Sequence, residues 1–302
     1  RLAHEEGMHL DVATGGELHV ALAAGVPPER LVLHGNNKSL DELRRARAAG
    51  VGRIVVDSFD ELDRLSQLGA GRKQPIPVMI RINPGIDSHT HDYRKTGIVD
   101  SKFGLGVHSG DAERGVEAHT HEFVRTGQVD SKFGFGLASG DAARAVGRAQ
   151  DSPAVELVGV HMHIGSQVFV ADFFHQAIEV VAPWVREVGL PELSIGGGLG
   201  VAYVEGEEAP TITEWGEAVV AACRDQGIEA RITAEPGRAI VAQAAITLYT
   251  VGTVKEIPGI RTYVSVDGGM SDNPRPVLYG SGYEAFLPRD AAAVRPRVVT
   301  VV

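Results

Sequence analysis

The sequence predicts an α/β fold: a (β/α)8 barrel that lacks its first strand, followed by a truncated C-terminal β domain. Three observations support this prediction. Short β-branched runs recur along residues 1–245, each followed by a helix-start signal and an amphipathic stretch, which is typical of βα units around a parallel sheet. The first four runs begin roughly 20 to 25 residues apart, and such short crossovers suit a closed barrel better than a doubly wound sheet. From residue 246 onward, β-rich segments follow one another without long helices.

Seven strands are expected in the barrel domain, which we place at residues 1–245. They lie at Leu10–Ala13, Leu31–His34, Arg53–Asp57, Val78–Ile82, Val155–His161, Glu192–Ile195 and Ala230–Ala234. Three of the helices between them should begin with a capping box, in which a hydroxyl caps a free N–H and a glutamate three residues later returns the hydrogen bond. The expected boxes are Thr14 with Glu17, Ser39 with Glu42 and Ser58 with Glu61. A closed barrel needs eight strands, so one is expected to be missing from this chain.

The C-terminal β domain, expected over residues 246–302, begins with strands at Ile246–Val254 and Thr262–Val266. The chain ends at Val298–Val302, which has the pattern of a strand interior. We therefore expect this second domain to be truncated.

One internal repeat lies between the fourth and fifth expected strands. His89–Gly104 returns 30 residues later as His119–Gly134, so residues 85–114 and 115–144 are two copies of one loop and helix start. A barrel needs one such connection. Because the second copy runs directly into the helix before Val155, we expect it to occupy the normal connection while part of the first copy is looped out, at little entropic cost.

The composition excludes several classes of protein. The 302 residues carry 39 acids and 29 bases, a formal net charge of −10, without a block of Lys or Arg, which argues against a nucleic-acid partner. The longest uncharged stretch, Ala239–Val254, is too short and too polar to span a membrane. The single cysteine, Cys223, cannot form an internal disulfide, and the N-terminus lacks the pattern of a secretory signal, so we expect a cytoplasmic protein.

Polar residues and glycines follow the expected barrel strands, at the ends where barrel enzymes place their chemistry. These are Asp11, His34 with Asn36, Asp57, Arg81 with Asn83, His161 with His163, Gly196–Gly198, and Glu235 with Arg238. The glycines of Gly196–Gly200 would let backbone N–H groups approach an anion, although a tight turn that needs positive φ explains them equally well. An isolated pair such as Glu235 and Arg238 is more often a salt bridge than a ligand site.

The segment His161-Met-His163 suggests a metal, as do the two His-Thr-His copies. We do not favour this interpretation, because side chains two apart on a strand point along parallel lines and no cysteine supplies a further ligand. The alternatives for these histidines are a ring that faces a planar cofactor and a structural histidine. Nucleophilic Ser-His-Asp catalysis finds no support, since the Gly-x-Ser-x-Gly motif is absent from the sequence.

Taken together, these features closely resemble the barrel-type pyridoxal 5′-phosphate (PLP)-dependent decarboxylases, and among them the branch that acts on diaminopimelate. The motifs that carry the resemblance follow the family's order over nearly the whole chain. They are Leu10–Leu18, Leu33–Ser39, the His-Thr-His to Lys-Phe-Gly segment, His163–Gln167, Gly196–Gly200, Glu235–Arg238 and Val266–Tyr279. The resemblance implies an alanine-racemase-like barrel, PLP as the cofactor, and decarboxylation of meso-2,6-diaminopimelate to L-lysine and carbon dioxide in lysine biosynthesis.

The resemblance also implies roles for single residues. Glu235 would pair with the pyridinium nitrogen of the cofactor, and His163 would stack on its ring. The residues expected to bind the cofactor or its surroundings are Asp11, Ser166, Gly197, Gly198, Glu235, Gly237 and Arg238. Arg238, Arg275 and Tyr279 are expected to bind the substrate, because an arginine fork suits its distal carboxylate and rejects a plain amine. No metal ligand is expected.

Two departures from the family pattern matter. The family forms a Schiff base with its cofactor through a lysine on the first barrel strand, and none of the lysines here lies in such a sequence context. The family also contributes a cysteine segment from its C-terminal domain across a homodimer with shared active sites, and Cys223 does not match that segment. We therefore expect this chain to be inactive by itself. The alternatives are an ornithine- or arginine-type decarboxylase of the same fold and a non-catalytic relative that binds partners without turnover.

Overall fold

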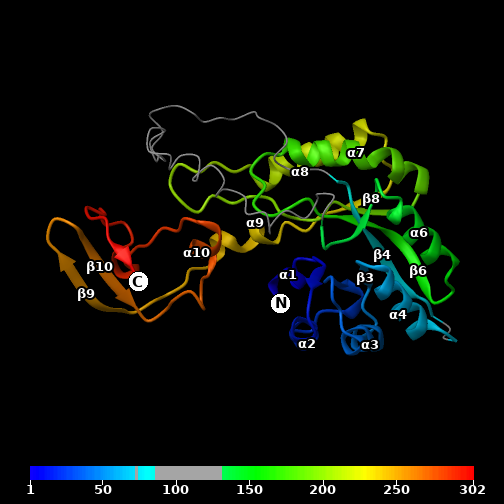
Figure 1. The fold of residues 1–302 in the computed structure, drawn as a ribbon, viewed down its shortest axis with the longest axis horizontal. Helices are drawn as coiled ribbons and strands as arrows, with labels where there is room; N and C mark the ends of the chain where they lie inside the picture. The colour runs from blue at the N-terminus through cyan, green and yellow to red at the C-terminus, as the bar shows by residue number, and fades with distance from the viewer. Residues whose placement is uncertain (72–73, 86–130) are drawn as a thin grey trace. The chain divides into compact units, whose positions relative to one another are not determined.

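The computed structural model describes residues 1–71, 74–85 and 131–302. Its described residues fall into two compact units (Figure 1), and each is treated by itself. The first unit comprises residues 1–71, 74–85, 131–200 and 210–238, and the second comprises residues 201–209 and 239–302. The boundary expected at residue 245 stays a prediction.

The first unit is built on a parallel sheet with the strand order β1-β2-β3-β4-β6-β7-β8. The strands are β1 (Leu10–Val12), β2 (Leu31–Leu33), β3 (Arg53–Val56), β4 (Ile76–Asn83), β6 (Val155–Met162), β7 (Glu192–Ser194) and β8 (Arg231–Thr233). The sheet curls as part of an α/β barrel, and all seven strands expected from the sequence are confirmed. Among the described residues β1 and β8 are the two ends of this order.

Helices connect the strands in the alternating pattern that a parallel sheet requires. They are α1 (Leu2–Glu5), α2 (Gly15–Ala23), α3 (Leu40–Ala49), α4 (Phe59–Gly69), α6 (Asp141–Asp151), α7 (Asp172–Val188), α8 (Ile212–Asp225) and α9 (Gly237–Val241), with a 3-10 turn at Pro28–Arg30. Figure 1 shows α7 and α8 running side by side, and their contact is closed by Phe174 packed edge-on against Trp215, with ring centroids 5.4 Å apart. None of the described helices has the length and apolar content needed to cross a bilayer.

The capping boxes expected from the sequence are partly confirmed. Ser39 and Glu42 form the complete reciprocal box at the start of α3. Thr14 and Ser58 also cap their helices, but the carboxylates of Glu17 and Glu61 accept the N–H groups of the residues that precede the caps. In both cases the bound N–H belongs to the residue between the end of the strand and the cap, Ala13 or Asp57. A further box, Thr211 with Glu214, begins α8 and was not expected.

Alternation along the strands separates two buried faces. One face packs against the helices through residues such as Leu33, Ile54 and Ile80, all at most 1% exposed. The other face carries a small apolar cluster from neighbouring strands, formed by Val32, Val55 and Met79 with Val158 against it. This second face is polar at both ends of the strands, and the functional site forms at one of them.

The described part of the second repeat copy lies in the connection between β4 and β6. It contains β5 (Phe135–Gly136), which pairs with the end of β4, and the start of α6, which packs on β4 and β6. Phe135 is buried and stacks edge-on against Phe59, with ring centroids 4.8 Å apart. Residues 86–114 of the first copy lie outside the described residues, so the choice between the copies stays a prediction.

The second unit contains a three-stranded sheet with the order β11-β10-β9. Its elements are β9 (Val251–Ile257), β10 (Arg261–Val266), α10 (Arg275–Tyr279) and β11 (Thr300–Val301), with 3-10 turns at Ala242–Ala244 and Pro288–Asp290. The first strand expected at Ile246–Val254 is therefore shifted toward the C-terminus. The observed strand β9 ends before Pro258, which has no N–H to donate to the ladder, and Gly259 then turns the chain with a φ of 73°.

Candidate functional site

The strand register gathers polar side chains on one face at the carboxyl ends of the strands. Arg81 of β4 pairs with His161 of β6, and His161 pairs with Ser194 of β7. Paired residues of parallel strands face the same side, and so do residues two apart on one strand. His34 therefore continues the face of Val32, and Glu235 continues the face of Thr233.

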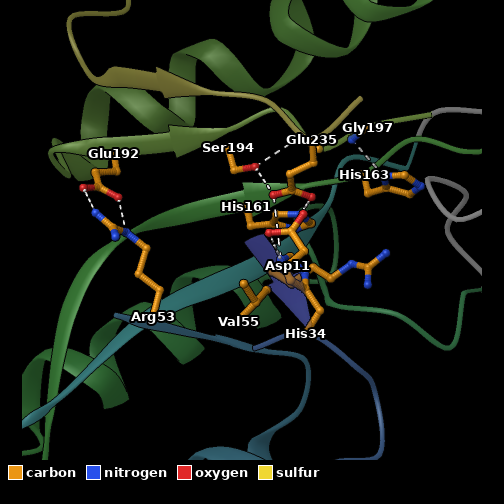
Figure 2. Close-up of polar contacts among 12 residues, drawn as sticks. Asp11, His34, Arg53, Val55, His161, His163, Glu192, Ser194, Gly197 and Glu235 are labelled. Atoms are coloured by element: carbon orange, nitrogen blue, oxygen red, sulfur yellow. Dashed lines mark hydrogen bonds and ion pairs between the residues drawn. The ribbon is translucent and has the colours of Figure 1, made fainter. Parts of the chain in front are cut away.

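Glu235 is the centre of this site (Figure 2). The hydroxyl of Ser194 donates to its Oε1 at 2.6 Å, and Nε2 of His161 lies 3.1 Å from its Oε2. The backbone holds it in place, because the N–H of Glu235 donates to the carbonyl of Gly196 at 2.9 Å. Burial alone would raise the pKa of Glu235, but His161, His34 and the Ser194 hydroxyl outweigh burial and hold the pKa well below its ordinary value. Glu235 is thus an ionised carboxylate with 20% of its side chain exposed.

Two histidines flank this carboxylate from different strands. His34 places Nε2 3.4 Å from Oδ1 of Asp11 and 3.9 Å from Oε1 of Glu235. Its ring meets the ring of His161 edge-on, with centroids 5.1 Å apart. Burial lowers the pKa of His161; it would do the same to His34, but the carboxylates of Asp11 and Glu235 outweigh it and raise the pKa of His34.

The glycine loop after β7 packs tightly against the loop after β6. Gly196 and Gly198 have φ values of 71° and 95°, and a Cβ on Gly197 or Gly198 would lie 2.1 or 2.0 Å from a backbone oxygen. The N–H of Gly197 donates to Nδ1 of His163 at 3.2 Å. Burial, helped by the charge of Arg81, lowers the pKa of His163 to about 3, so this ring is neutral. The positive-φ turn is therefore present at this loop, whereas the approach of its N–H groups to an anion stays a prediction.

The other expected site residues lie at different distances from this centre. Asp11 reaches it from β1, whereas Ser166 is half-buried in the loop after β6. Gly237 and Arg238 begin α9 just after Glu235, and the N–H of Gly237 donates to the carbonyl of Glu235 at 2.8 Å. Arg275 and Tyr279 belong to α10 of the second unit. Their roles, like those of the other expected ligands, stay predictions.

Several residues at the site had no assigned role. Arg81 lies with its guanidinium carbon 4.5 Å from the ring centroid of Phe133 and Nη1 3.6 Å from Oδ2 of Asp57. Asp57 in turn accepts the N–H of Gly134 at 2.6 Å. The signal in the sequence was the position of Asp57 and Arg81 directly at strand ends. Ser194 carried no signal, because one serine at the end of a short apolar strand is common.

Lys38 lies just after β2, but its amine is committed elsewhere. Its Nζ donates to the carbonyls of Gly35 and Val55, each at 2.6 Å, and lies 2.7 Å from Oε1 of Glu61. The residue is 3% exposed. The ammonium therefore makes two hydrogen bonds and one ion pair, and Lys38 connects these segments in the interior.

Chemically, the site combines an ionised carboxylate, two adjacent imidazoles and a neutral histidine against a glycine loop. His34, His161 and Glu235 place one potential ligand atom each within 4.8 Å of one another. The arrangement can bind a protonated ring nitrogen or a metal cation at the carboxylate. It offers no hydroxyl or thiol activated for nucleophilic attack among the described residues.

The chain matches the family model described as "Pyridoxal-dependent decarboxylase, pyridoxal binding domain" over residues 1–114 and 111–242. The two ranges overlap at residues 111–114, the end of the first repeat copy.

Among curated proteins, the chain is 40% identical over 312 residues to the diaminopimelate decarboxylase of Bacillus subtilis, covering 100% of this chain and 64% of that protein. It is 41% identical over 321 residues to the diaminopimelate decarboxylase of Mycobacterium tuberculosis, covering 99% of this chain and 65% of that protein. Among solved structures, the Helicobacter pylori diaminopimelate decarboxylase complexed with L-lysine matches with a TM-score of 0.75 and 29% identity. That match covers 94% of this chain and 64% of the other. The chain thus spans a little under two thirds of the length of these relatives.

Proposed function

Because the chain belongs to the family of pyridoxal-dependent decarboxylases, we propose that it binds PLP and serves the decarboxylation of meso-2,6-diaminopimelate to L-lysine and carbon dioxide. The observation that carries the proposal is the ionised carboxylate of Glu235 at the end of β8. Both its donors, Ser194 and His161, favour the charged form, and one fifth of the side chain remains open to a ligand.

These residues fit the cofactor chemically. Bound PLP supplies a ring that takes up the electrons left behind when carbon dioxide departs, and this requires a protonated pyridine nitrogen. Glu235 would accept the N–H of that nitrogen and keep it charged. A neutral carboxyl group could not do so, and the hydrogen bonds to Glu235 prevent its protonation near neutral pH.

His163 and the glycine loop orient the ring and the phosphate. The His163 ring is neutral, so it can lie against an aromatic cation without charge repulsion. The hydrogen bond from Gly197 to Nδ1 fixes the ring and leaves the proton on Nε2. Gly198, Ser166 and Arg238 would hold the phosphate, and Gly197 would form part of its surroundings through the hydrogen bond to His163. Gly237 would let the backbone approach the phosphate, and Asp11 would complete the cofactor site beside His34.

The substrate assignment rests on the relatives and on three side chains. Arg238, Arg275 and Tyr279 would bind the substrate, with Arg275 and Tyr279 reading its distal carboxylate. A fork of guanidinium donors matches a carboxylate and not an amine, which distinguishes diaminopimelate from ornithine or arginine. We also propose a homodimer with shared active sites, to be checked by light scattering.

We further propose that no lysine of the described residues forms the imine with the cofactor. The Lys38 ammonium is bound by two carbonyls and paired with Glu61. Lys132 is exposed with its Nζ 5.3 Å from the ring centroid of Phe133, and Lys255 lies on β9 of the second unit. Without a lysine at the site among the described residues, the chain would bind PLP without turning over substrate. The lack of a site lysine among the described residues also favours the alternative, a non-catalytic relative that binds partners without turnover.

The test is PLP binding to the purified chain, followed by absorbance and by calorimetry. Glu235→Gln should weaken binding roughly 10- to 100-fold, because one charge-assisted hydrogen bond is lost. Glu179→Gln, an exposed change on α7, is the matched control and should bind as the parent does. Equal affinity of Glu235→Gln and parent would contradict the assignment.

The reaction is tested by carbon dioxide release from diaminopimelate, ornithine and arginine, with borohydride trapping of any imine. We expect no release and no trapped imine on Lys38, Lys132 or Lys255. Turnover of diaminopimelate with a trapped lysine among these three would overturn the lysine proposal and support the reaction. Turnover of ornithine or arginine in preference would overturn the substrate.

A further inference from the structure

We propose that His34, His161 and Glu235, with Asp11 as a fourth ligand, form a site for a divalent transition-metal ion of the zinc type. The ion would occupy the position that the proposed function gives to the ring nitrogen of the cofactor. The inference goes beyond that function, because the metal is a competitor of the cofactor and takes no part in the reaction.

The spacing of the ligand atoms suits tetrahedral coordination. Bonds of about 2.0 to 2.1 Å to imidazole and carboxylate place neighbouring ligand atoms roughly 3.3 Å apart. His161 Nε2 and Glu235 Oε2 are 3.1 Å apart, and His34 Nε2 and Asp11 Oδ1 are 3.4 Å apart. His34, His161 and Glu235 place one ligand atom each within 4.8 Å of one another, which is close enough for the three to converge on one ion.

The donor set also suits this class of ion. Two imidazoles and two carboxylates favour zinc over magnesium or calcium, which prefer oxygen ligands alone. The two carboxylates balance the charge of the dication. Nε2 of His34 is buried without a hydrogen bond among the described residues, so binding a metal there breaks no hydrogen bond at that atom.

The surrounding contacts hold two of the ligands in place. The Ser194 hydroxyl fixes Oε1 of Glu235 and leaves Oε2 directed at His161. This is the kind of outer contact that orients metal ligands. The pair of histidines differs from the one that the sequence suggested, because Nδ1 of His163 accepts the N–H of Gly197, while His161 meets His34 from another strand.

Metal and PLP would exclude one another at Glu235. A carboxylate bound to a dication cannot also accept the N–H of a pyridinium. The metal ion and the protonated ring would also repel each other, because both are positively charged. By linkage, each ligand must weaken the binding of the other by the same factor.

The experiment is calorimetric titration of zinc chloride into the metal-free and PLP-free chain. We expect the chain to bind zinc. Each of three substitutions should weaken the zinc affinity by about 100-fold or more: His34→Gln, His161→Gln and Glu235→Gln. His175→Gln on α7 is the matched control and should leave the affinity unchanged. Circular dichroism separates loss of the site from loss of the fold. Unchanged zinc affinity in the three folded variants would overturn the proposal.

The two His-Thr-His segments are the rival ligands, and they lie outside the described residues. A variant with His89, His91, His119 and His121 all changed to Gln should keep the site that depends on His34 and Glu235. If zinc binding disappears in that variant and persists in Glu235→Gln, the proposal is wrong.

Competition separates this inference from the proposed function. PLP should raise the apparent zinc dissociation constant by a factor of one plus the ratio of the free PLP concentration to the PLP dissociation constant. Zinc binding that depends on Glu235 in a chain that never binds PLP supports the metal site and overturns the proposed function. PLP binding without any zinc binding supports the proposed function and overturns the metal site.

Discussion

One buried ammonium ties three segments of the barrel together. Lys38 joins its own loop to the end of β3 through the Val55 carbonyl and to α4 through Glu61. Glu61 also accepts the N–H of Asp57, which leads on to Arg81 at the functional site. Burial raises the pKa of Glu61, and Lys38 opposes that shift. The two charges therefore depend on each other for burial.

Lys38→Met should lower the free energy of unfolding by about 3 to 5 kcal/mol, because it leaves the Glu61 carboxylate buried without its charged partner. The double variant Lys38→Met with Glu61→Gln should recover part of this loss. Urea unfolding followed by fluorescence measures both. A single variant as stable as the parent would show that the pair contributes nothing to the fold.

The only cysteine offers a second check at the scale of one residue. Cys223 is 4% exposed on α8, and burial raises the pKa of its thiol to about 11. At pH 8 the native thiol should react with a disulfide reagent roughly 100-fold or more slowly than a free cysteine, because little thiolate is present. In urea the rate should become that of a free thiol. Fast labelling of the folded chain would contradict this burial.

At the scale of elements, an ion cluster joins strands that are not neighbours. Glu192 of β7 accepts from Arg53 of β3, with Nε to Oε2 at 2.6 Å and Nη2 to Oε1 at 2.5 Å, and Arg231 of β8 also contacts it. Figure 2 shows the Arg53 and Glu192 pair away from Glu235, at the other end of the strands. The cluster links β3 to β7 across two intervening strands, so it stabilises the curvature of the sheet.

This cluster predicts an acid-sensitive contribution to stability. Burial alone would raise the pKa of Glu192, but Arg53 and Arg231 outweigh burial and lower it. Since the folded pKa lies below the unfolded one, the contribution is present above the unfolded pKa of about 4.3 and is lost as the pH falls through the folded pKa.

Urea unfolding at pH 6 and pH 3 should therefore show a larger stability difference between parent and Glu192→Gln at pH 6 than at pH 3. Glu187→Gln, an exposed change on α7, is the control and should give no such dependence. A difference that grows on acidification would show that the pKa of Glu192 is raised in the folded state.

At the scale of the whole molecule, the tandem repeat provides two similar segments for the one connection between β4 and β6. Deleting residues 85–114 or residues 115–144 gives two chains of equal length that keep the start of α6. The two copies differ at 12 of their 30 positions, and one of these is Phe135, which the second deletion replaces by Leu105. Only the first deletion keeps the contact between Phe135 and Phe59.

We expect the chain without residues 85–114 to be at least as stable as the parent, because a shorter loop costs less entropy to close. The chain without residues 115–144 should be less stable by about 1 to 2 kcal/mol, from the lost aromatic pair and a smaller buried side chain. Urea unfolding compares the two. The reverse order of stability would show that the first copy occupies the connection.

The sequence by itself determined the seven barrel strands, the helix starts and the positions of Asp11, Glu235 and the glycine loop at strand ends. These features depend on local chemistry: alternation along a strand, a hydroxyl that caps a helix, or a glycine where φ is positive. The family resemblance came from the same local motifs and was confirmed by the comparisons. The repeat was also visible in the sequence, and the expectation that its second copy occupies the connection rests on the position of that copy directly before the helix.

Only the tertiary structure decided which distant residues meet. Arg53 and Glu192 are 139 residues apart, and nothing in either strand marks the other as its partner. His161 joins His34 and Glu235, while His163, two residues further on, turns to the glycine loop. The carboxylates of Glu17 and Glu61 leave the expected capping boxes for other N–H groups. These contacts follow from strand order, register and sheet curvature, which are set by packing of the whole unit and leave no periodic signal in the sequence.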